Sequence, residues 1–271
     1  KNYLNVKKKF FDDLDNNAHS LINSDDKNSK YIIQNTKSKV HTYSISKNAD
    51  FKLKVVENSF EGLVLKIEGI EVNTKLIGNF NAYNLLTVFS VSKILKINTE
   101  KILISMSLLK NPEGRFDVII KNKIIGIVDY AHTPDALLNV LETIVKIKQN
   151  ENSIITVVGC GGGRDRAKRL KMGSIASRLS QKVIFTSDNP RDEDPKSIID
   201  DMIAGVDDAD KSKILNIVDR KEAIVKASKV AKPNDILLVA GKGHEKYQII
   251  KSKKIRFNDK EILTQTLKMA V

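Results

Sequence analysis

An apolar run leads into a charged loop in the sequence VIFTSDNPRDEDP, residues 183–195. Residues 183–186 are typical of a buried strand, and residues 198–203 begin a helical pattern. Open α/β sheets place their ligand sites in a loop of this kind, between a strand and the following helix. The loop suits a zwitterion, because an arginine pairs a carboxylate with two parallel hydrogen bonds. The alternative is a helix N-terminus capped by Asp192 or Asp194, with Pro195 in the first turn.

The same alternation of strand and helix extends on both sides of this stretch. Strands are expected at residues 124–128, 154–158, 183–186, 214–218 and 236–240. Helices are expected at residues 134–148, 167–180, 196–204, 220–231 and 259–269. Near-continuous apolar strands separated by helices predict an α/β fold with a Rossmann-like, doubly wound and mostly parallel sheet.

The first 110 residues show a different pattern. Helices are expected at residues 3–15, 79–95 and 99–109, the last with Thr99 as its N-cap. Short segments at residues 18–22, 31–33, 40–45, 51–56 and 62–67 predict a strand-rich region with antiparallel pairs. The break NPEGR, residues 111–115, separates the two patterns. A chain of 271 residues has room for two domains, which we expect at residues 1–111 and 112–271.

Composition excludes several classes of protein. The sequence has no apolar run near the roughly 20 residues of a membrane span, no signal peptide and a single cysteine, Cys160. We therefore expect a soluble, cytoplasmic protein without membrane insertion. The net charge is +13, but only eight of the 46 basic residues are arginine and the lysines are scattered, which argues against a nucleic-acid partner. Because Lys1 leads directly into a helical pattern, we expect the chain to be the C-terminal part of a longer protein.

Four of the expected strands end in loops that carry reactive side chains. These loops are DYAHTPD at 129–135, GCGGGRDR at 159–166, the loop at 187–195 and GKGHE at 241–245. Because the carboxyl ends of parallel strands meet at one edge of a sheet, the four loops are predicted to converge.

Individually, these loops allow more than one interpretation. The glycines suit a dinucleotide phosphate, with Asp188 on the ribose, but Arg164 replaces the third glycine of G-x-G-x-x-G, and a plain tight turn is also possible. His132 and His244 are metal ligands or bases, or else hydrogen-bonded turn residues, since no third ligand has zinc spacing. Cys160 is expected to gain thiolate character at a helix N-terminus. The phosphate loop G-x-x-x-x-G-K-[ST] does not occur in the sequence.

Taken together, the four loops resemble the Mur ligases in order and spacing, in particular the UDP-N-acetylmuramoyl-tripeptide synthetases (MurE). The resemblance extends to YLNVKKKFF at 3–11, NSDD at 23–26, GNFNAYN at 78–84 and YQ at 247–248, and so covers essentially the whole chain. It implies a three-domain enzyme of which this chain holds the C-terminal part of the central ATPase domain and the complete C-terminal domain. The N-terminal UDP-binding domain and the Walker-type loop would be missing, so the chain alone is expected to be inactive.

The resemblance also implies a reaction. With ATP and Mg²⁺, such an enzyme converts the D-Glu γ-carboxylate of UDP-MurNAc-L-Ala-D-Glu into an acyl phosphate. The amine of meso-diaminopimelate then attacks, in peptidoglycan precursor synthesis. Two alternatives from other classes are a nonenzymatic module that binds an amino acid or a nucleotide, and the dinucleotide-binding domain of a dehydrogenase.

Five residues match the family's ATP and magnesium positions. Lys7 matches a lysine whose carbamate helps to hold Mg²⁺, and Asn81 and Asn84 match the adenine side. Arg115 and Asp129 match contacts with ATP phosphate and ribose, and His132 sits beside them without an assigned role. The structural alternatives are a solvated helix face for Lys7, a helix start and a surface amide for the asparagines, a salt bridge for Arg115 and a strand-end cap for Asp129.

Seven residues match the family's meso-diaminopimelate site: Arg164, Asp188, Asn189, Pro190, Arg191, Gly241 and Glu245. Arg191 would pair the distal carboxylate, Glu245 the distal ammonium, and Arg164 the carboxylate near the attacking amine. A buried arginine without that carboxylate would be destabilising, so Arg191 favours diaminopimelate, or an analogue such as lanthionine, over lysine. Gly163 stands where the family usually has Asp or Asn, and Leu170 where a proline is common.

Overall fold

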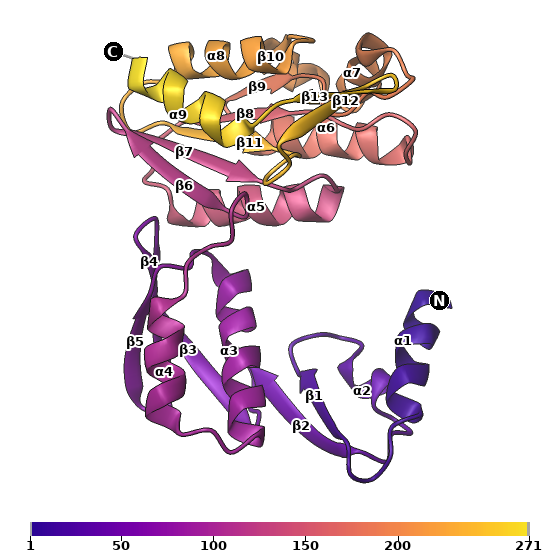
Figure 1. Ribbon diagram of the computed structural model, residues 1–271, viewed down its shortest axis with the longest axis vertical. Coiled ribbons are helices and arrows are strands. Elements are labelled where there is room, and N and C mark those ends of the chain that lie inside the picture. The colour runs from indigo at the N-terminus through magenta and orange to yellow at the C-terminus, as the bar shows by residue number, and fades with distance from the viewer. Residues whose placement is uncertain (1, 270–271) are drawn as a thin grey trace. The chain divides into compact units, whose positions relative to one another are not determined.

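The computed structural model describes residues 2–269. The chain divides into two compact units, Lys1–Lys110 and Asn111–Val271. In Figure 1 the first unit runs from indigo to magenta and the second from magenta to yellow.

The first unit is a five-stranded sheet with helices. Its elements are α1 (Asn2–Asp12), β1 (His19–Asn23), α2 (Ser29–Ile32), β2 (Lys39–Ser44), β3 (Phe51–Ser59), β4 (Gly62–Ile67), β5 (Ile70–Thr74), α3 (Asn79–Ile94) and α4 (Thr99–Leu108). The strands lie in the order β1-β2-β3-β4-β5. Helices α3 and α4 pack beside β3–β5 (Figure 1). Leu65, Ile67, Leu86 and Phe89 form part of the buried core of this unit.

Several expectations for this unit need correction. The pairs β1–β2 and β2–β3 are parallel, and only β3–β4 and β4–β5 are antiparallel as expected. Residues 31–33 lie in and after helix α2, because a run of three residues is too short for periodicity to separate helix from strand. Strand β5 was not expected, although Glu68 and Gly69, both with positive φ, make the tight turn that leads into it. The N-cap of α4 is Asn98, whose side chain accepts from the backbone N–H of Lys101, and not Thr99.

The second unit is the expected α/β domain. Its elements are β6 (Asp117–Lys121), β7 (Ile124–Asp129), α5 (Pro134–Ile147), β8 (Ile154–Val158), α6 (Ala167–Leu179), β9 (Lys182–Phe185), α7 (Pro195–Ile203), the 3-10 turn η1 (Asp208–Lys213), β10 (Ile214–Asn216), α8 (Arg220–Val230), β11 (Ile236–Ala240), β12 (Tyr247–Ile250), β13 (Lys253–Arg256) and α9 (Asp259–Met269). The sheet order is β10-β9-β8-β11-β7-β6. All pairs except β6–β7 are parallel, so the predicted mostly parallel sheet is confirmed.

The topology of this sheet determines where a ligand can bind. Strand β11 lies between β7 and β8, and β9 lies on the other side of β8. The loops after β7, β8, β9 and β11 are therefore neighbours at the carboxyl edge, where the strand order changes direction. Helix α7 starts beside this edge, capped by Asp194, whose side chain accepts from the backbone N–H groups of Lys196 and Ser197. Of the two capping alternatives, Asp194 is confirmed.

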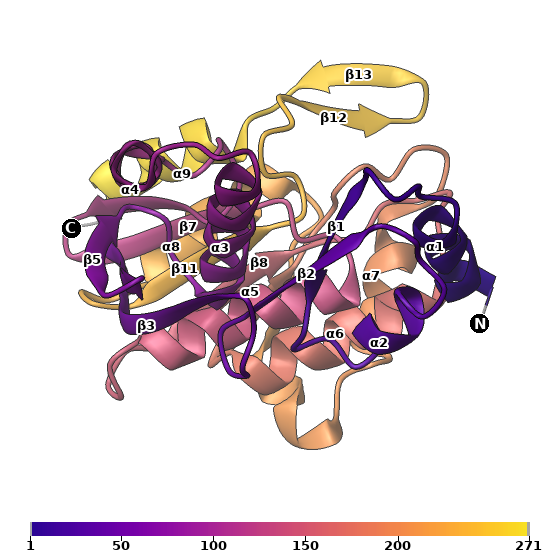
Figure 2. The same cartoon turned by 90° about the horizontal axis from the view of Figure 1, so that it is seen from below.

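Two pieces of the second unit were not expected from the sequence. Strand β6 joins β7 through a tight turn at Asn122 and Lys123, which both have positive φ. Strands β12 and β13 form a separate hairpin, which extends away from the six-stranded sheet in Figure 2. The lysines of this hairpin interrupt the alternation of apolar residues by which a strand is predicted. None of the helices described within residues 2–269 has the length and apolar character that crossing a membrane requires.

Candidate functional site

The four polar loops of the second unit meet around one pocket of about 360 Å³. The residues that line it are Tyr130, His132, Thr133, Gly161, Arg164, Asp165, Lys168, Asp188, Asn189, Arg191, Gly241 and Glu245. The predicted convergence is therefore present, and six of the seven residues assigned to the amino-acid site line the same pocket. The seventh, Pro190, is buried and does not line it.

One side of the pocket is acidic, and a buried lysine donates hydrogen bonds to the side chains that form it. Asp188 is 5% exposed, and the Glu245 carboxylate accepts from Asn189 Nδ2 at 3.0 Å. The Nζ of Lys242 lies 2.9 Å from Glu245 Oε2, 3.0 Å from Asn189 Oδ1 and 3.4 Å from Asp188 Oδ1. Sequence reasoning missed Lys242, although its place between two glycines directly after a buried strand was a usable signal.

The electrostatics of Glu245 follow from these contacts. Burial alone would raise the pKa of Glu245, but the hydrogen bond and the charge of Lys242, helped by Asn189, hold that pKa below its ordinary value. Glu245 is therefore a carboxylate that can receive an ammonium group. Gly241, with φ +119°, lies over the neighbouring acid, because a Cβ there would be 2.8 Å from Asp188 Oδ2.

The lining of the pocket also includes three basic side chains, those of Arg164, Lys168 and Arg191. Arg191 has φ +53°, and its backbone pairs with β12 through Ile249 and Lys251. Its Nη1 donates to the Gly162 carbonyl at 2.6 Å. The side chain is half-buried and not fully buried, so the argument from a buried arginine does not apply to it as the sequence suggested.

The glycine loop owes its composition to close packing against the loop at 187–195. A Cβ on Gly162 would lie 2.0 Å from the Pro190 carbonyl oxygen. Gly163 has φ +61°, a conformation that glycine, asparagine and aspartate adopt most readily, so its departure from the family pattern preserves the backbone. Here the glycines allow two loops to approach each other. That close approach accounts for the glycines of this loop, so a bound dinucleotide phosphate is not needed to explain them.

One arginine of this loop region does not face the pocket. Arg169 is completely buried and pairs with Glu193 at 3.0 Å and with Asp201 at 2.9 Å. Arg169 is therefore paired with two acids and does not line the pocket. Arg166 is exposed and lies 3.3 Å from the same aspartate.

Cys160 is inert in this structure. It is 2% exposed and its Sγ lies 3.5 Å from Met172 Sδ. Burial raises the pKa of its thiol to about 12. The expectation of thiolate character is wrong, because burial favours the neutral thiol and α6 begins only at Ala167.

The loop after β7 is built around Tyr130. The guanidinium of Arg115 lies 4.6 Å from the Tyr130 ring centre, and the rings of His132 and His244 lie 4.5 and 5.0 Å from it. Asp129 receives the backbone N–H groups of Phe116 and Ala131, each at 2.7 Å. Burial nevertheless raises the pKa of Asp129. Asp129 thus has the contacts of a strand-end cap, and Arg115 stacks on an aromatic ring where a salt bridge was the structural alternative.

The remaining assigned residues lie in the first unit. Lys7 is exposed on α1, with Nζ 4.8 Å from the Tyr3 ring centre, whereas its neighbour Lys8 is 9% exposed and pairs with Asp12 at 2.7 Å. Asn84 Nδ2 donates to Asn81 Oδ1 at 3.2 Å, so both asparagines do share one face of α3. Within residues 2–269, no group of three or more His, Cys, Asp or Glu side chains could hold a metal ion.

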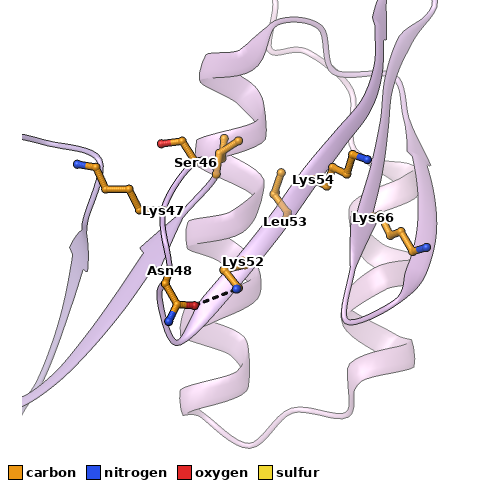
Figure 3. A pocket seen from close by; sticks show the side chains of 8 residues that line it. Ser46, Lys47, Asn48, Lys52, Leu53, Lys54 and Lys66 are labelled. Atoms are coloured by element: carbon orange, nitrogen blue, oxygen red, sulfur yellow. Dashed lines mark hydrogen bonds between the residues drawn. The ribbon is translucent and has the colours of Figure 1, made fainter.

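A second hollow, of about 480 Å³, lies on the first unit and is lined by Lys47, Lys52, Lys54 and Lys66 (Figure 3). The Lys52 amino group donates to Asn48 Oδ1 at 3.0 Å, and Lys47 Nζ donates to the Ser24 carbonyl at 2.9 Å. No carboxylate is among its lining residues, so this hollow lacks the paired charges that a zwitterion requires.

Known protein families match both units. The family model described as "Mur ligase middle domain" matches residues 1–92, and the one described as "Mur ligase, glutamate ligase domain" matches residues 114–243. The chain belongs to the Mur ligase family. The resemblance expected from the loops is confirmed, and the Mur ligase fold extends over both units.

Relatives among curated Mur ligases match the whole chain. One from Bacteroides fragilis, named UDP-N-acetylmuramoyl-L-alanyl-D-glutamate--2,6-diaminopimelate ligase, is 51% identical over 271 residues, which is 100% of this chain and 56% of that protein. A protein of the same name from Oceanobacillus iheyensis is 38% identical over 277 residues, 98% of this chain and 56% of the relative. The chain spans about half the length of the curated relatives it matches.

Solved structures of Mur ligases match the fold. A structure of a UDP-N-acetylmuramoyl-L-alanyl-D-glutamate--2,6-diaminopimelate ligase is 33% identical with a TM-score of 0.66, over 98% of this chain and 56% of that one. MurF ligase from Thermotoga maritima in complex with ADP has a TM-score of 0.69 at 14% identity, over 98% and 57% of the two chains, and so supports the fold alone.

Proposed function

We propose that this chain is the larger part of an ATP-dependent ligase that adds meso-diaminopimelate to UDP-MurNAc-L-Ala-D-Glu in peptidoglycan synthesis. The observation that carries the proposal is the single pocket in which Arg191 and Glu245 face a common space. The names of the relatives that match the whole chain support the same substrate. Such a reaction uses nucleotide-linked substrates and belongs in the cytoplasm.

In this proposal the pocket binds the distal end of diaminopimelate as a zwitterion. Arg191 uses one N–H on the Gly162 carbonyl and keeps others for the distal carboxylate. Glu245, whose Oε2 already accepts from Lys242 and Asn189, offers its other oxygen to the distal ammonium. Arg164 is exposed at the rim, where it receives the carboxylate beside the attacking amine. Fixing both ends in this way orients the reacting amine, which is the main contribution a protein makes to such a transfer.

The chain contains part of the proposed site for ATP and Mg²⁺, and the side chains assigned to it have donor and acceptor groups that suit these ligands. ATP bound with Mg²⁺ supplies the phosphoryl group that activates the substrate carboxylate. Lys7 has the exposure that carbamylation of its amine requires, and its carbamate would be an oxygen ligand of the kind that Mg²⁺ prefers. Asn84 and Asn81 would meet the adenine, and Arg115, Asp129 and His132 the ribose and phosphates.

The main phosphate cradle is proposed to come from outside this sequence, which has no G-x-x-x-x-G-K-[ST] loop. For that reason we propose that the 271-residue chain by itself binds the amino acid but has no ligase activity.

Titration calorimetry of the chain tests this proposal. We expect meso-diaminopimelate to bind, and L-lysine, which lacks the distal carboxylate, to bind at least about tenfold more weakly, because it cannot form the charge-assisted pair with Arg191. Binding of NAD without binding of diaminopimelate would instead identify a dinucleotide module and overturn the proposal.

A further inference from the structure

Lys242 is completely buried beneath the acidic side of the pocket and is not among its lining residues. Its Nζ donates three hydrogen bonds, to Glu245 Oε2 at 2.9 Å, Asn189 Oδ1 at 3.0 Å and Asp188 Oδ1 at 3.4 Å. An ammonium group has three N–H donors, so these three side chains account for all of them. Lys242 therefore acts on the pocket through its neighbours and does not reach a ligand itself.

The first neighbour that Lys242 orients is Asn189. The amide oxygen of Asn189 accepts from Lys242 Nζ and also from the backbone N–H of Ile249, at 2.9 Å. Because both partners are donors, only the oxygen of the amide fits there. The NH₂ group of Asn189 is consequently turned toward Glu245 Oε2, 3.0 Å away.

The second effect of Lys242 concerns charge. Asp188 and Glu245 both line this pocket, and the Lys242 ammonium contacts both carboxylates. Lys242 is the cation in contact with both, while Arg220 and His244 act on them from farther away. Counted as ionised, two carboxylates and one ammonium leave a net charge of about −1, which matches a single ligand ammonium.

We propose that Lys242 is a positioning residue for the amino-acid substrate. It holds Asn189 and Glu245 in the orientation that receives the distal ammonium of diaminopimelate, and it sets the net charge that this ammonium meets. The inference rests on the proposed function, because it takes diaminopimelate as the ligand of this pocket.

Calorimetry with two ligands separates positioning from a purely structural role. The first ligand is meso-diaminopimelate, and the second is 2-aminopimelate, which keeps the distal carboxylate but lacks the distal ammonium. Lys242→Met should weaken diaminopimelate binding at least about tenfold and change 2-aminopimelate binding by less than about threefold, since only the first ligand uses Glu245. Lys246→Met is the matched control, because that lysine is 63% exposed and pairs with Glu113, and it should bind both ligands like the unmodified chain.

A second comparison keeps the test decisive if Lys242→Met does not fold. Glu245→Gln is compared with the double variant Glu245→Gln/Lys242→Met. The double variant should bind diaminopimelate no more weakly than Glu245→Gln, because the carboxylate that Lys242 positions is already absent and the double variant also removes a cation from beside the ligand ammonium. Three outcomes would overturn this inference and leave the proposed function in place. They are equal diaminopimelate binding by the unmodified chain and Lys242→Met, an equal loss of affinity for both ligands in Lys242→Met, and a further loss of tenfold or more in the double variant. No diaminopimelate binding by the unmodified chain would overturn it together with the proposed function.

Discussion

The Arg169 guanidinium lies 3.0 Å from the Glu193 carboxylate, and this pair joins α6 to the loop at 187–195, which both supply basic residues to the pocket. Arg169 also donates to the Gly161 carbonyl at 3.3 Å, and Glu193 accepts the backbone N–H of Gly163 at 2.5 Å. A cation from α6 and an anion from the loop at 187–195 thus hold the glycine loop from both sides. Arg191, whose Nη1 contacts Gly162, depends on that arrangement for its position.

This pair predicts a specific dependence of stability on pH. The hydrogen bond from Arg169 is the main cause that lowers the pKa of Glu193 from 4.5 to about 2. A carboxyl group with a lowered folded pKa stabilises the fold above its unfolded pKa, and this contribution is lost as the pH falls from about 4.5 toward 2. Glu193→Gln should therefore lower the free energy of unfolding at pH 7, and the difference from the unmodified chain should vanish near pH 2.

Urea unfolding at pH 7 and at low pH measures this difference in the free energy of unfolding. Glu151→Gln, at an exposed position of a turn, is the control and should have little effect at either pH. A Glu193→Gln variant as stable as the unmodified chain at pH 7 would contradict the account.

A second ion pair of this unit, Arg220–Asp259, is predicted to affect the free energy of unfolding more strongly than Arg169–Glu193 does. Arg220 and Asp259 are both 0% exposed and form two hydrogen bonds of 2.8 Å, while Arg220 also donates to the Ala240 carbonyl at 2.9 Å. Asp259→Asn leaves a buried guanidinium without its counter-charge and should reduce the free energy of unfolding by about 3–5 kcal/mol. The double variant Arg220→Met/Asp259→Leu should recover most of this loss in urea unfolding. A loss below about 1 kcal/mol in the single variant would show that the pair is not buried as described.

Cys160 provides a test of local burial. With the pKa of its thiol raised to about 12 by burial, very little thiolate is present at pH 8. Iodoacetamide should therefore label the folded chain at least about 100 times more slowly than the chain in 8 M urea, followed by mass spectrometry. Equal labelling rates in the two conditions would contradict the buried position.

The sequence predicts the elements of the second unit well because each strand is an apolar run. Residues 154–158 and 236–240 are completely apolar apart from Thr156, so their burial on both faces could be predicted directly. The loops at their carboxyl ends followed from the parallel order. Strands β12 and β13 could not be found in this way, because each is only four residues long and the lysines of β13 remove the apolar alternation that marks a strand.

The charged residues of the site were harder to predict. Arg164 and Arg169 are five positions apart in the same basic stretch, yet one is exposed at the pocket and the other is buried against Glu193. Likewise, Lys242 is buried while Lys246 is exposed. Composition and spacing do not distinguish such pairs, since each outcome depends on an acid that a different loop brings into contact.

The central claim is that Arg191 recognises the distal carboxylate of diaminopimelate. The most direct test measures ADP-release kinetics of the protein as encoded, with any residues that precede Lys1. Arg191→Ala should raise the KM for diaminopimelate about 100-fold, since it removes a bidentate charge-assisted pair worth roughly 3 kcal/mol, and leave the KM for ATP within about twofold. Arg256→Ala, at a side chain that is 85% exposed, is the matched control and should change neither constant. An unchanged KM for diaminopimelate in Arg191→Ala would contradict the account.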